Sequence, residues 1–416
     1  MVNARQAVKK VGMFTSFKFF NYRLVFTYST LMSIAGWAHQ VTMDWLVLDL
    51  TGSAAALGGM LVFQLGPFIL VSVIGGSIAD RFNKRNFLML VTAFDATFSF
   101  SLFFLYHKGT LTYSFLCFTA LIIATFNAME GPVRTSISLE VVRAENLANV
   151  MSLNSVTFNI GRLLGTLMAG LLITQFDNGA PWFALGLIYF TLLCILPILR
   201  VHEIEMENFG ASKPGKLIDA IRFLRTTPML VLSMALAATF IGLGMQFALT
   251  SSLMVKNIFK LNASYLGYIG AAVSLGSIVG AVIAARWSVP GHLPKLSTML
   301  KSGVLVSIFW MLSAFMPSFW GYAFFAGVAS IFHLTFMVTS NSLVTSSSPE
   351  DFRGRIYGIY LFIFYIGAAT GGPLVGWFAQ ATSVRTAIFC GGALTFLISA
   401  YVYSRKRRFE KQVAAA

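Results

Sequence analysis

The sequence predicts an all-α membrane protein with twelve transmembrane helices, arranged as two pseudo-symmetric bundles of six. The first observation is composition, because 57% of the 416 residues are hydrophobic and only 11% are charged. The second is that the apolar segments are long enough to cross a hydrocarbon core of ~30 Å as helices and lack the alternation of β-barrel strands. The third is a sequence repeat at about half the chain length, which is typical of transporters built from two related halves.

Apolar segments and charged breaks set the expected domain organisation. We expect spans at 24–49, 54–78, 87–106, 112–133, 148–174, 182–199, 228–255, 264–285, 296–316, 319–345, 355–379 and 384–403. These group into an N-terminal bundle, 24–199, and a C-terminal bundle, 228–403, with cytoplasmic segments at 1–23, 200–227 and 404–416.

The placement of the cations predicts the topology. With both termini inside, 25 of the 30 Lys and Arg residues fall in or near cytoplasmic segments, Arg162 falls deep within a span, and four fall at the outer side: Lys108, Lys256, Lys260 and Arg385. This asymmetry favours a multi-pass protein of the cytoplasmic membrane with both termini cytoplasmic. The net charge of +15 is therefore expected to interact with the lipid bilayer and not with nucleic acid. We expect the basic cluster 405–408 to bind anionic lipid headgroups.

A charged loop separates the second and third spans, with three cations and one acid within residues 80–85. It resembles the loop between helices 2 and 3 of the major facilitator superfamily, which has Gly, three residues, Asp-Arg, two residues and two basic residues. The matching positions are Gly76, Asp80, Arg81, Lys84 and Arg85. The alternative is an ordinary basic cytoplasmic loop.

Arg353 and Arg355, before the eleventh span, extend this resemblance. In the family, the loop aspartate meets the positively polarised start of helix 11 and bridges the two halves. The resemblance therefore implies that Asp80 takes part in a conformational gate.

Spans four and five carry the most specific motif of the chain. The matching residues are Pro132, Arg134, Asn154, Ser155, Phe158, Asn159 and Arg162. They resemble the macrolide-efflux and siderophore-export branch of the superfamily, the transmembrane secretion effectors. This resemblance implies an exporter of small compounds.

Arg162 lies about fourteen residues into its span, near the expected bilayer midplane. An unpaired guanidinium is costly there, so we expect an acidic or carbonyl partner. The candidate acids are Asp44, Asp95 and Glu130, and the arginine shares a helical face with Asn159, which we expect to line a cavity. A purely structural clamp between the arginine and an acid is the alternative.

Span one has a polar stripe at helical spacing, made of Ser33, Trp37, Gln40 and Asp44. A carboxylate at lipid depth is expected to face a cavity or a partner. The alternative places Asp44 near the outer mouth, in contact with water.

The second half offers fewer polar candidates. Gln246 and Asn341 are expected to line the cavity. His333 suits proton exchange because the ordinary pKa of histidine is near neutrality, and a neutral histidine bonded to a neighbouring helix is the alternative.

Two glycine triplets 206 residues apart mark the repeat: Gly161, Gly165 and Gly170 in span five, and Gly367, Gly371 and Gly376 in span eleven. Small residues let membrane helices approach closely, so we expect these positions at helix crossings. In the family, such a ridge in helix 5 marks antiporters.

We therefore expect a monomeric secondary transporter that exports small amphipathic compounds in exchange for protons. The proton is assigned to Asp44 or Glu130, with Asp95 and His333 as further candidates. No enzymatic activity, cofactor or metal is expected. An uptake symporter for a small solute or metal chelate and a membrane sensor that transports nothing are the alternatives.

Overall fold

The computed structural model describes residues 15–79, 83–142, 146–199, 217–244, 246–287, 296–349 and 353–414. The N-terminal half contains η1 (Thr15–Lys18), α1 (Phe20–Thr51), α2 (Ala54–Ala79), α3 (Lys84–His107), α4 (Tyr113–Glu140), α5 (Leu147–Gln175), α6 (Ala180–Ile195) and η3 (Leu196–Ile198). The C-terminal half contains α7 (Leu217–Thr226), α8 (Pro228–Thr239), η5 (Phe240–Gly244), α9 (Phe247–Leu253), η6 (Met254–Ile258), α10 (Ser264–Trp287), α11 (Leu296–Ala314), α12 (Phe319–Ser346), α13 (Arg353–Ala381) and α14 (Val384–Ala414).

Each of the twelve predicted spans is helical, so the predicted fold class is confirmed. In the described part of the chain, 11 segments are long and apolar enough to cross a membrane. The first predicted span lies in α1, which has 32 residues and is not among these 11 segments. Its polar side chains Asn21, Ser29, Thr42 and Asp44 are buried against other helices. A helix can therefore span the bilayer with this composition because its polar face is turned away from lipid.

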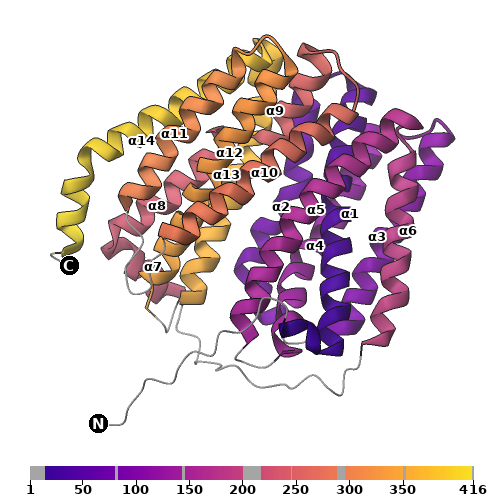
Figure 1. Cartoon of the computed structure of the whole chain (residues 1–416), viewed down its shortest axis with the longest axis horizontal. Coiled ribbons are helices and arrows are strands. Elements are labelled where there is room, and N and C mark those ends of the chain that lie inside the picture. The colour runs from indigo at the N-terminus through magenta and orange to yellow at the C-terminus, as the bar shows by residue number, and fades with distance from the viewer. Residues whose placement is uncertain are drawn as a thin grey trace.

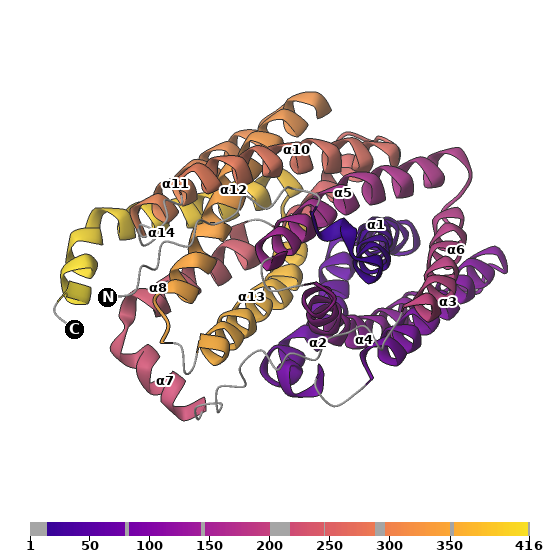
Figure 2. The ribbon, with the colours of Figure 1, turned by 60° about the horizontal axis from the view of Figure 1, so that its bottom comes forward.

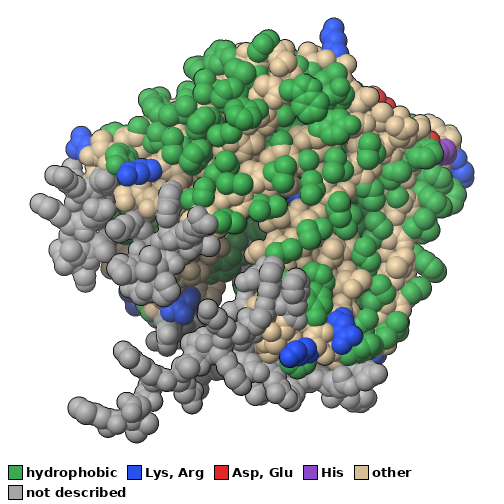
Figure 3. Space-filling view, in the orientation of Figure 1, with side chains coloured by type: hydrophobic (Ala, Val, Ile, Leu, Met, Phe, Trp, Pro, Cys, Tyr) green, Lys and Arg blue, Asp and Glu red, His purple; other side chains and the backbone are tan. Residues whose placement is uncertain are grey.

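The two halves lie side by side and meet through two helix pairs, α2 with α13 and α5 with α10 (Figures 1 and 2). In Figure 1 the halves converge at the top and separate toward the bottom, where α1 begins and α7 lies. We call this end the α7 side. Figure 3 shows that the surface is hollowed between the halves toward the α7 side, while hydrophobic side chains cover much of the visible face.

Polar contacts tie the halves together at the end opposite α7. Lys256 Nζ lies 3.0 Å from Oδ1 of Asp49, and Ser264 Oγ donates to Oγ1 of Thr174 at 2.7 Å. The aromatic rings of Phe68 in α2 and Tyr365 in α13 lie 5.2 Å apart near the middle of both helices. The described contacts between the halves thus extend from the far end to mid-depth, and the hollow in Figure 3 lies on the α7 side of them.

The first glycine triplet packs α5 against two partners. A Cβ atom at Gly161 would lie 2.4 Å from Cβ of Ser33, and one at Gly165 would lie 2.3 Å from the carbonyl oxygen of Ile34, so both glycines contact α1. A Cβ atom at Gly170 would lie 2.6 Å from a carbonyl oxygen of the backbone that leads into α10. The first two glycines therefore pack within the half, and the third packs across the halves.

The second triplet repeats this arrangement in α13. A Cβ atom at Gly367 would lie 2.5 Å from the backbone of α8, and one at Gly371 would lie 1.9 Å from the carbonyl oxygen of Gly242 in η5. A Cβ atom at Gly376 would lie 2.5 Å from the carbonyl oxygen of the first residue of α2. The packing of the two triplets thus follows the same pseudo-symmetry as the sequence repeat.

Candidate functional site

Arg162 lies where α1, α5 and α10 meet. Its Nε donates to Oγ of Ser274, in α10 of the other half, at 3.0 Å, and its Nη2 donates to Oδ1 of Asn159 at 3.4 Å. The guanidinium carbon stands 5.6 Å from the centre of the Trp37 ring, within the range of a cation–π interaction. A cation at mid-helix is thus held by a hydroxyl, an amide and an aromatic ring.

The acidic partner expected for Arg162 is not found among the described residues, where the carbonyl group that accepts from it is the side-chain amide of Asn159. No described carboxylate forms an ion pair with it. Asp44 accepts from Gln40 instead. Glu130 pairs with Arg134, and the oxygens of Asp95 have no hydrogen-bond partner among the described residues. Asp44 follows Trp37 by seven residues, which is about 10 Å along an α-helix. The polar stripe of α1 therefore places Trp37 next to Arg162, whereas Asp44 lies two helical turns further along α1.

Asp44 is buried, with only 2% of its surface exposed. Gln40 Nε2 donates to its Oδ1 at 2.8 Å and lies 3.2 Å from Oε1 of Gln64 in α2. The alternative that Asp44 is solvated at the outer mouth is therefore wrong. Ser33, from the same stripe, packs against Gly161 at the crossing of α1 and α5.

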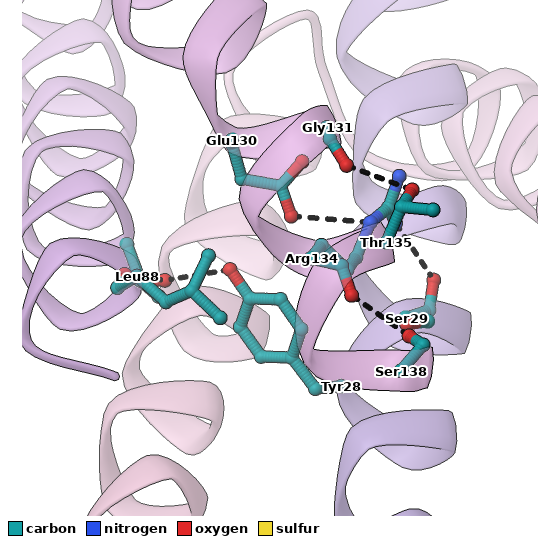
Figure 4. A network of polar contacts seen from close by, with 9 residues as sticks. Tyr28, Ser29, Leu88, Glu130, Gly131, Arg134, Thr135 and Ser138 are labelled. Carbon is teal, nitrogen blue, oxygen red and sulfur yellow. Dashed lines mark hydrogen bonds and ion pairs between the residues drawn. The ribbon is translucent and has the colours of Figure 1, made fainter. Parts of the chain in front are cut away.

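A second group of buried charges lies inside the N-terminal half (Figure 4). Arg134 Nε lies 3.2 Å from Oε1 of Glu130, one turn earlier in α4, and its Nη1 lies 3.5 Å from the carbonyl oxygen of Ser29. The hydroxyl of Tyr28 is 3.2 Å from Oγ1 of Thr92 in α3. We call Tyr28, Asp95, Glu130 and Arg134 the acid cluster.

Asp95 is the most isolated carboxyl of the acid cluster. Only 1% of its surface is exposed, and neither of its oxygens has a hydrogen-bond partner among the described residues. The charge of Glu130 acts on it from α4. Asp95 is therefore a buried carboxyl without a hydrogen bond among the described residues.

The predicted candidates of the second half have different surroundings. The charge of Arg162 acts on His333, which lies in α12 of the other half. The Nε2 atom of His333 has no hydrogen-bond partner among the described residues. Asn341 Nδ2 donates to the hydroxyl of Tyr357 in α13 at 3.3 Å. Only the histidine is therefore linked to the surroundings of the arginine.

Gln246 is buried at the break between η5 and α9. Its Nε2 lies 2.9 Å from the carbonyl oxygen of Ile241, 3.1 Å from that of Gly242 and 3.1 Å from that of Ala368. Two of these carbonyls belong to η5, just before the break, and the third belongs to α13. Gln246, predicted to line the cavity, thus donates its side-chain amide to backbone carbonyls at the break.

The predicted gate is described in part. Lys84 forms an ion pair with Glu140 of α4, and Arg85 Nη1 lies 3.4 Å from the carbonyl oxygen of Leu199. Arg353 and Arg355 stand in the first turn of α13. Asp80 and Arg81 lie outside the described residues, and so does the side-chain environment at Gly76. The bridge between Asp80 and the start of α13 stays a prediction.

Sequence reasoning missed Ser274 and Gln64. A signal for the first existed, because Gly267, Gly270 and Ser274 follow one another at three and four residues. A Cβ atom at Gly270 would lie 2.3 Å from Oγ1 of Thr166 in α5. A stripe of small residues on α10 could therefore have marked the face that meets the arginine helix.

Comparison with known families decides the identity of the fold. The sequence model of the transmembrane secretion effectors matches residues 11–415. The chain belongs to this family. It is therefore a membrane transporter of the major facilitator superfamily, as its motifs in spans four and five predicted.

Relatives of known activity support this assignment. The chain is 25% identical to the enterobactin exporter EntS of Shigella flexneri over 378 residues, which cover 84% of this chain and 82% of that protein. It is 23% identical to the multidrug efflux pump Tap of Mycolicibacterium fortuitum over 375 residues, 86% and 88% of the two chains. The staphyloferrin A transporter of Staphylococcus aureus is 24% identical over 272 residues, 63% of this chain and 66% of that protein.

Solved structures share the fold. A bacterial homologue of the human lysosomal transporter Spinster, in an inward-facing and unoccupied conformation, superimposes with a TM-score of 0.74 at 14% identity, covering 94% of this chain and 98% of that chain. The nucleoside transporter NupG also gives a TM-score of 0.74, at 12% identity, with 92% and 98% covered.

Proposed function

We propose that this chain exports small amphipathic compounds of the drug or siderophore type from the cytoplasm, in exchange for protons. It works as a monomer in the cytoplasmic membrane, with the α7 side and both termini in the cytoplasm. The names of the relatives, two siderophore transporters and a multidrug efflux pump, support the substrate class.

One observation carries the proposal: a polar site at lipid depth where the halves meet. Arg162 of the N-terminal half bonds to Ser274 of the C-terminal half, and the surface between the halves is hollowed toward the α7 side (Figure 3). The contacts at the opposite end close the other exit. Rocking of the two halves would open that end and close the α7 side, which gives alternating access.

The buried carboxyls supply the coupling. Asp44, Asp95 and Glu130 are all shielded from water at lipid depth, where a carboxyl is stable when protonated and costly when ionised. The acid cluster joins two of these groups to Arg134, so that taking up or releasing one proton changes its net charge. Asp44 and His333 remain the other candidates for the proton.

The experiment is transport in inside-out membrane vesicles and in proteoliposomes, with a panel of cationic, neutral and anionic amphipathic fluorophores. Export predicts accumulation of at least one fluorophore in inside-out vesicles when the lumen is acid, and loss of accumulation with a proton ionophore. Flux that ignores the pH gradient would contradict the exchange. Accumulation in right-side-out vesicles would favour an uptake symporter, and no flux of any compound would favour a sensor.

A further inference from the structure

We infer that the compound bound at Arg162 carries a negative charge, as a carboxylate or an ionised phenol attached to an aromatic or apolar body. This inference rests on the proposed function, because it assigns the charge of the transported compound at the same site. It adds the chemical group that Arg162 recognises.

The charge of Arg162 has no counter-charge in the described protein. Its hydrogen-bond partners, Ser274 and Asn159, are neutral, and Trp37 offers only the face of its ring. Burial disfavours the charged form of the guanidinium, and no described carboxylate offsets this effect. A cation withdrawn from water at lipid depth is costly unless an anion joins it.

The acids of the described chain are engaged elsewhere. Asp44 accepts from Gln40, two turns along α1 from Trp37. Glu130 pairs with Arg134, and the charge of Glu130 acts on Asp95 within the acid cluster. At the membrane surfaces, Asp49 pairs with Lys256 and Glu140 with Lys84. Asp177 lies 3.3 Å from His107, and Asp219 lies 3.6 Å from Arg222. The described part of the chain thus supplies no acid to Arg162, and we assign the counter-charge to a ligand.

The described contacts of Arg162 leave hydrogen-bond donors for such a group. A guanidinium has five N–H donors in a planar fork, and the described contacts use one at Nε and one at Nη2. The remaining donors on Nη1 and Nη2 can take both oxygens of a carboxylate in a bidentate pair. Trp37 beneath the guanidinium, with Phe158 at 5.5 Å from its ring, provides aromatic surface for the rest of the molecule.

His333 supplies a second polar contact. It feels the charge of Arg162, and its Nε2 has no hydrogen-bond partner among the described residues. It comes from α12 of the C-terminal half, whereas Arg162 comes from α5. Since Arg162 also bonds to Ser274 of the C-terminal half, an anion bound to Arg162 would lie where the two halves meet, which links its binding to their relative position.

The test compares matched acids and amides. Purified full-length protein is titrated with 1-naphthoate and 1-naphthamide, and with 4-biphenylcarboxylate and its amide, by thermal shift and by quenching of tryptophan fluorescence. We expect each acid to bind at least about tenfold more tightly than its amide, because only the acid gains a charge-assisted pair. Equal binding of acid and amide, or no binding of either acid, would overturn the inference.

Variants locate the effect. Arg162→Gln should abolish the preference for the acid, and Arg162→Lys should retain part of it, because lysine keeps the charge but not the fork. The matched control is Arg385→Gln, since Arg385 also lies over an aromatic ring, at 5.9 Å from the centre of Phe259, but outside this site. Its preference should be unchanged. A preference that survives in Arg162→Gln would refute the assignment, and the wild-type comparison stands even if this variant does not fold.

Transport distinguishes this inference from the proposed function. If cationic or neutral fluorophores are driven by the pH gradient while the acids are neither bound nor transported, the exporter stands and the anion site fails. If the acids bind through Arg162 but no compound of any charge is transported, the site stands and the exporter fails.

Discussion

Gly58 in α2 is the position where one methyl group should change which side of the transporter is open. A Cβ atom there would lie 2.4 Å from the carbonyl oxygen of Gly372 and 3.1 Å from Cα of Pro373, both in α13 of the other half. These are backbone atoms, so they cannot rotate away. The perturbation is Gly58→Ala, which is expected to destabilise the present conformation, closed at this end.

The magnitude follows from overpacking. Inserting a methyl group into a tight contact costs about 1–3 kcal/mol. The gain in helix propensity from glycine to alanine cancels, because α2 is helical in both conformations. When the halves part at this end, the added methyl group no longer meets α13. The ratio of the two conformations should therefore shift by about 5- to 150-fold away from the one described here.

The assay is a distance measurement between the halves at the end opposite α7. Spin labels at Lys108→Cys and Ala381→Cys, both exposed in the described structure, report this distance in lipid nanodiscs by pulsed electron resonance. The exposed native Cys194 and Cys390 are first replaced by serine. Gly58→Ala should enlarge the population with the longer distance.

Two matched variants test the reasoning. Gly66 lies in the same helix with nothing within 4 Å of a Cβ atom, so Gly66→Ala should leave the distances unchanged. At Gly165 a Cβ atom would lie 2.3 Å from the carbonyl oxygen of Ile34 in the same half, so Gly165→Ala should lower the melting temperature without a conformational shift. Unchanged distances in Gly58→Ala, or an equal shift in Gly66→Ala, would refute this account.

Three further substitutions test the acid cluster, the helix break and the outer ion pair. Asp95→Asn removes a carboxyl that we propose as a proton carrier, so transport driven by a pH gradient in proteoliposomes should fall at least about tenfold while counterflow exchange persists; unchanged gradient-driven transport would contradict this role. Gln246→Ala leaves backbone carbonyls without their partner, so thermal unfolding should show a loss of about 1–3 kcal/mol; an unchanged melting temperature would argue against it. Lys256→Gln breaks a partly exposed ion pair with Asp49, so the free energy of unfolding should fall by at most about 1 kcal/mol in the same assay. A loss of stability as large as that of Gln246→Ala would contradict this small contribution.

The fold was predictable because the bilayer fixes how long each apolar segment must be. The expected span 54–78 corresponds to α2, Ala54–Ala79, and 319–345 to α12, Phe319–Ser346. The interruption of the seventh span at η5 was not foreseen. Its sequence is as apolar as its neighbours, and a π-helical turn is specified by backbone contacts such as that between Gly242 and Gly371, which no local pattern records.

The site was predictable only where a single residue carries the signal. An arginine at lipid depth is unusual enough that Arg162 could be selected from its position alone. Its partners depend on the rotation of each helix and on how two separate bundles meet. Ser274 lies 112 residues further along the chain and joins the site only through the contact between halves. Asp44, although on the same stripe as Trp37, is displaced by the rise of its own helix.

The glycine triplets connect folding with transport. Spacing alone predicted a packing ridge, but the structure assigns different neighbours to its members: Gly161 and Gly165 contact helices of their own half, whereas Gly170 contacts the other half. In the second triplet, Gly367 and Gly371 likewise contact helices of their own half, and Gly376 contacts the other half. If the halves move as rigid bodies, contacts of the first two glycines of each triplet must persist through the cycle, while those of the third must be made and lost. Bulkier residues at the first two positions should therefore impair folding, and bulkier residues at the third should change the conformational balance.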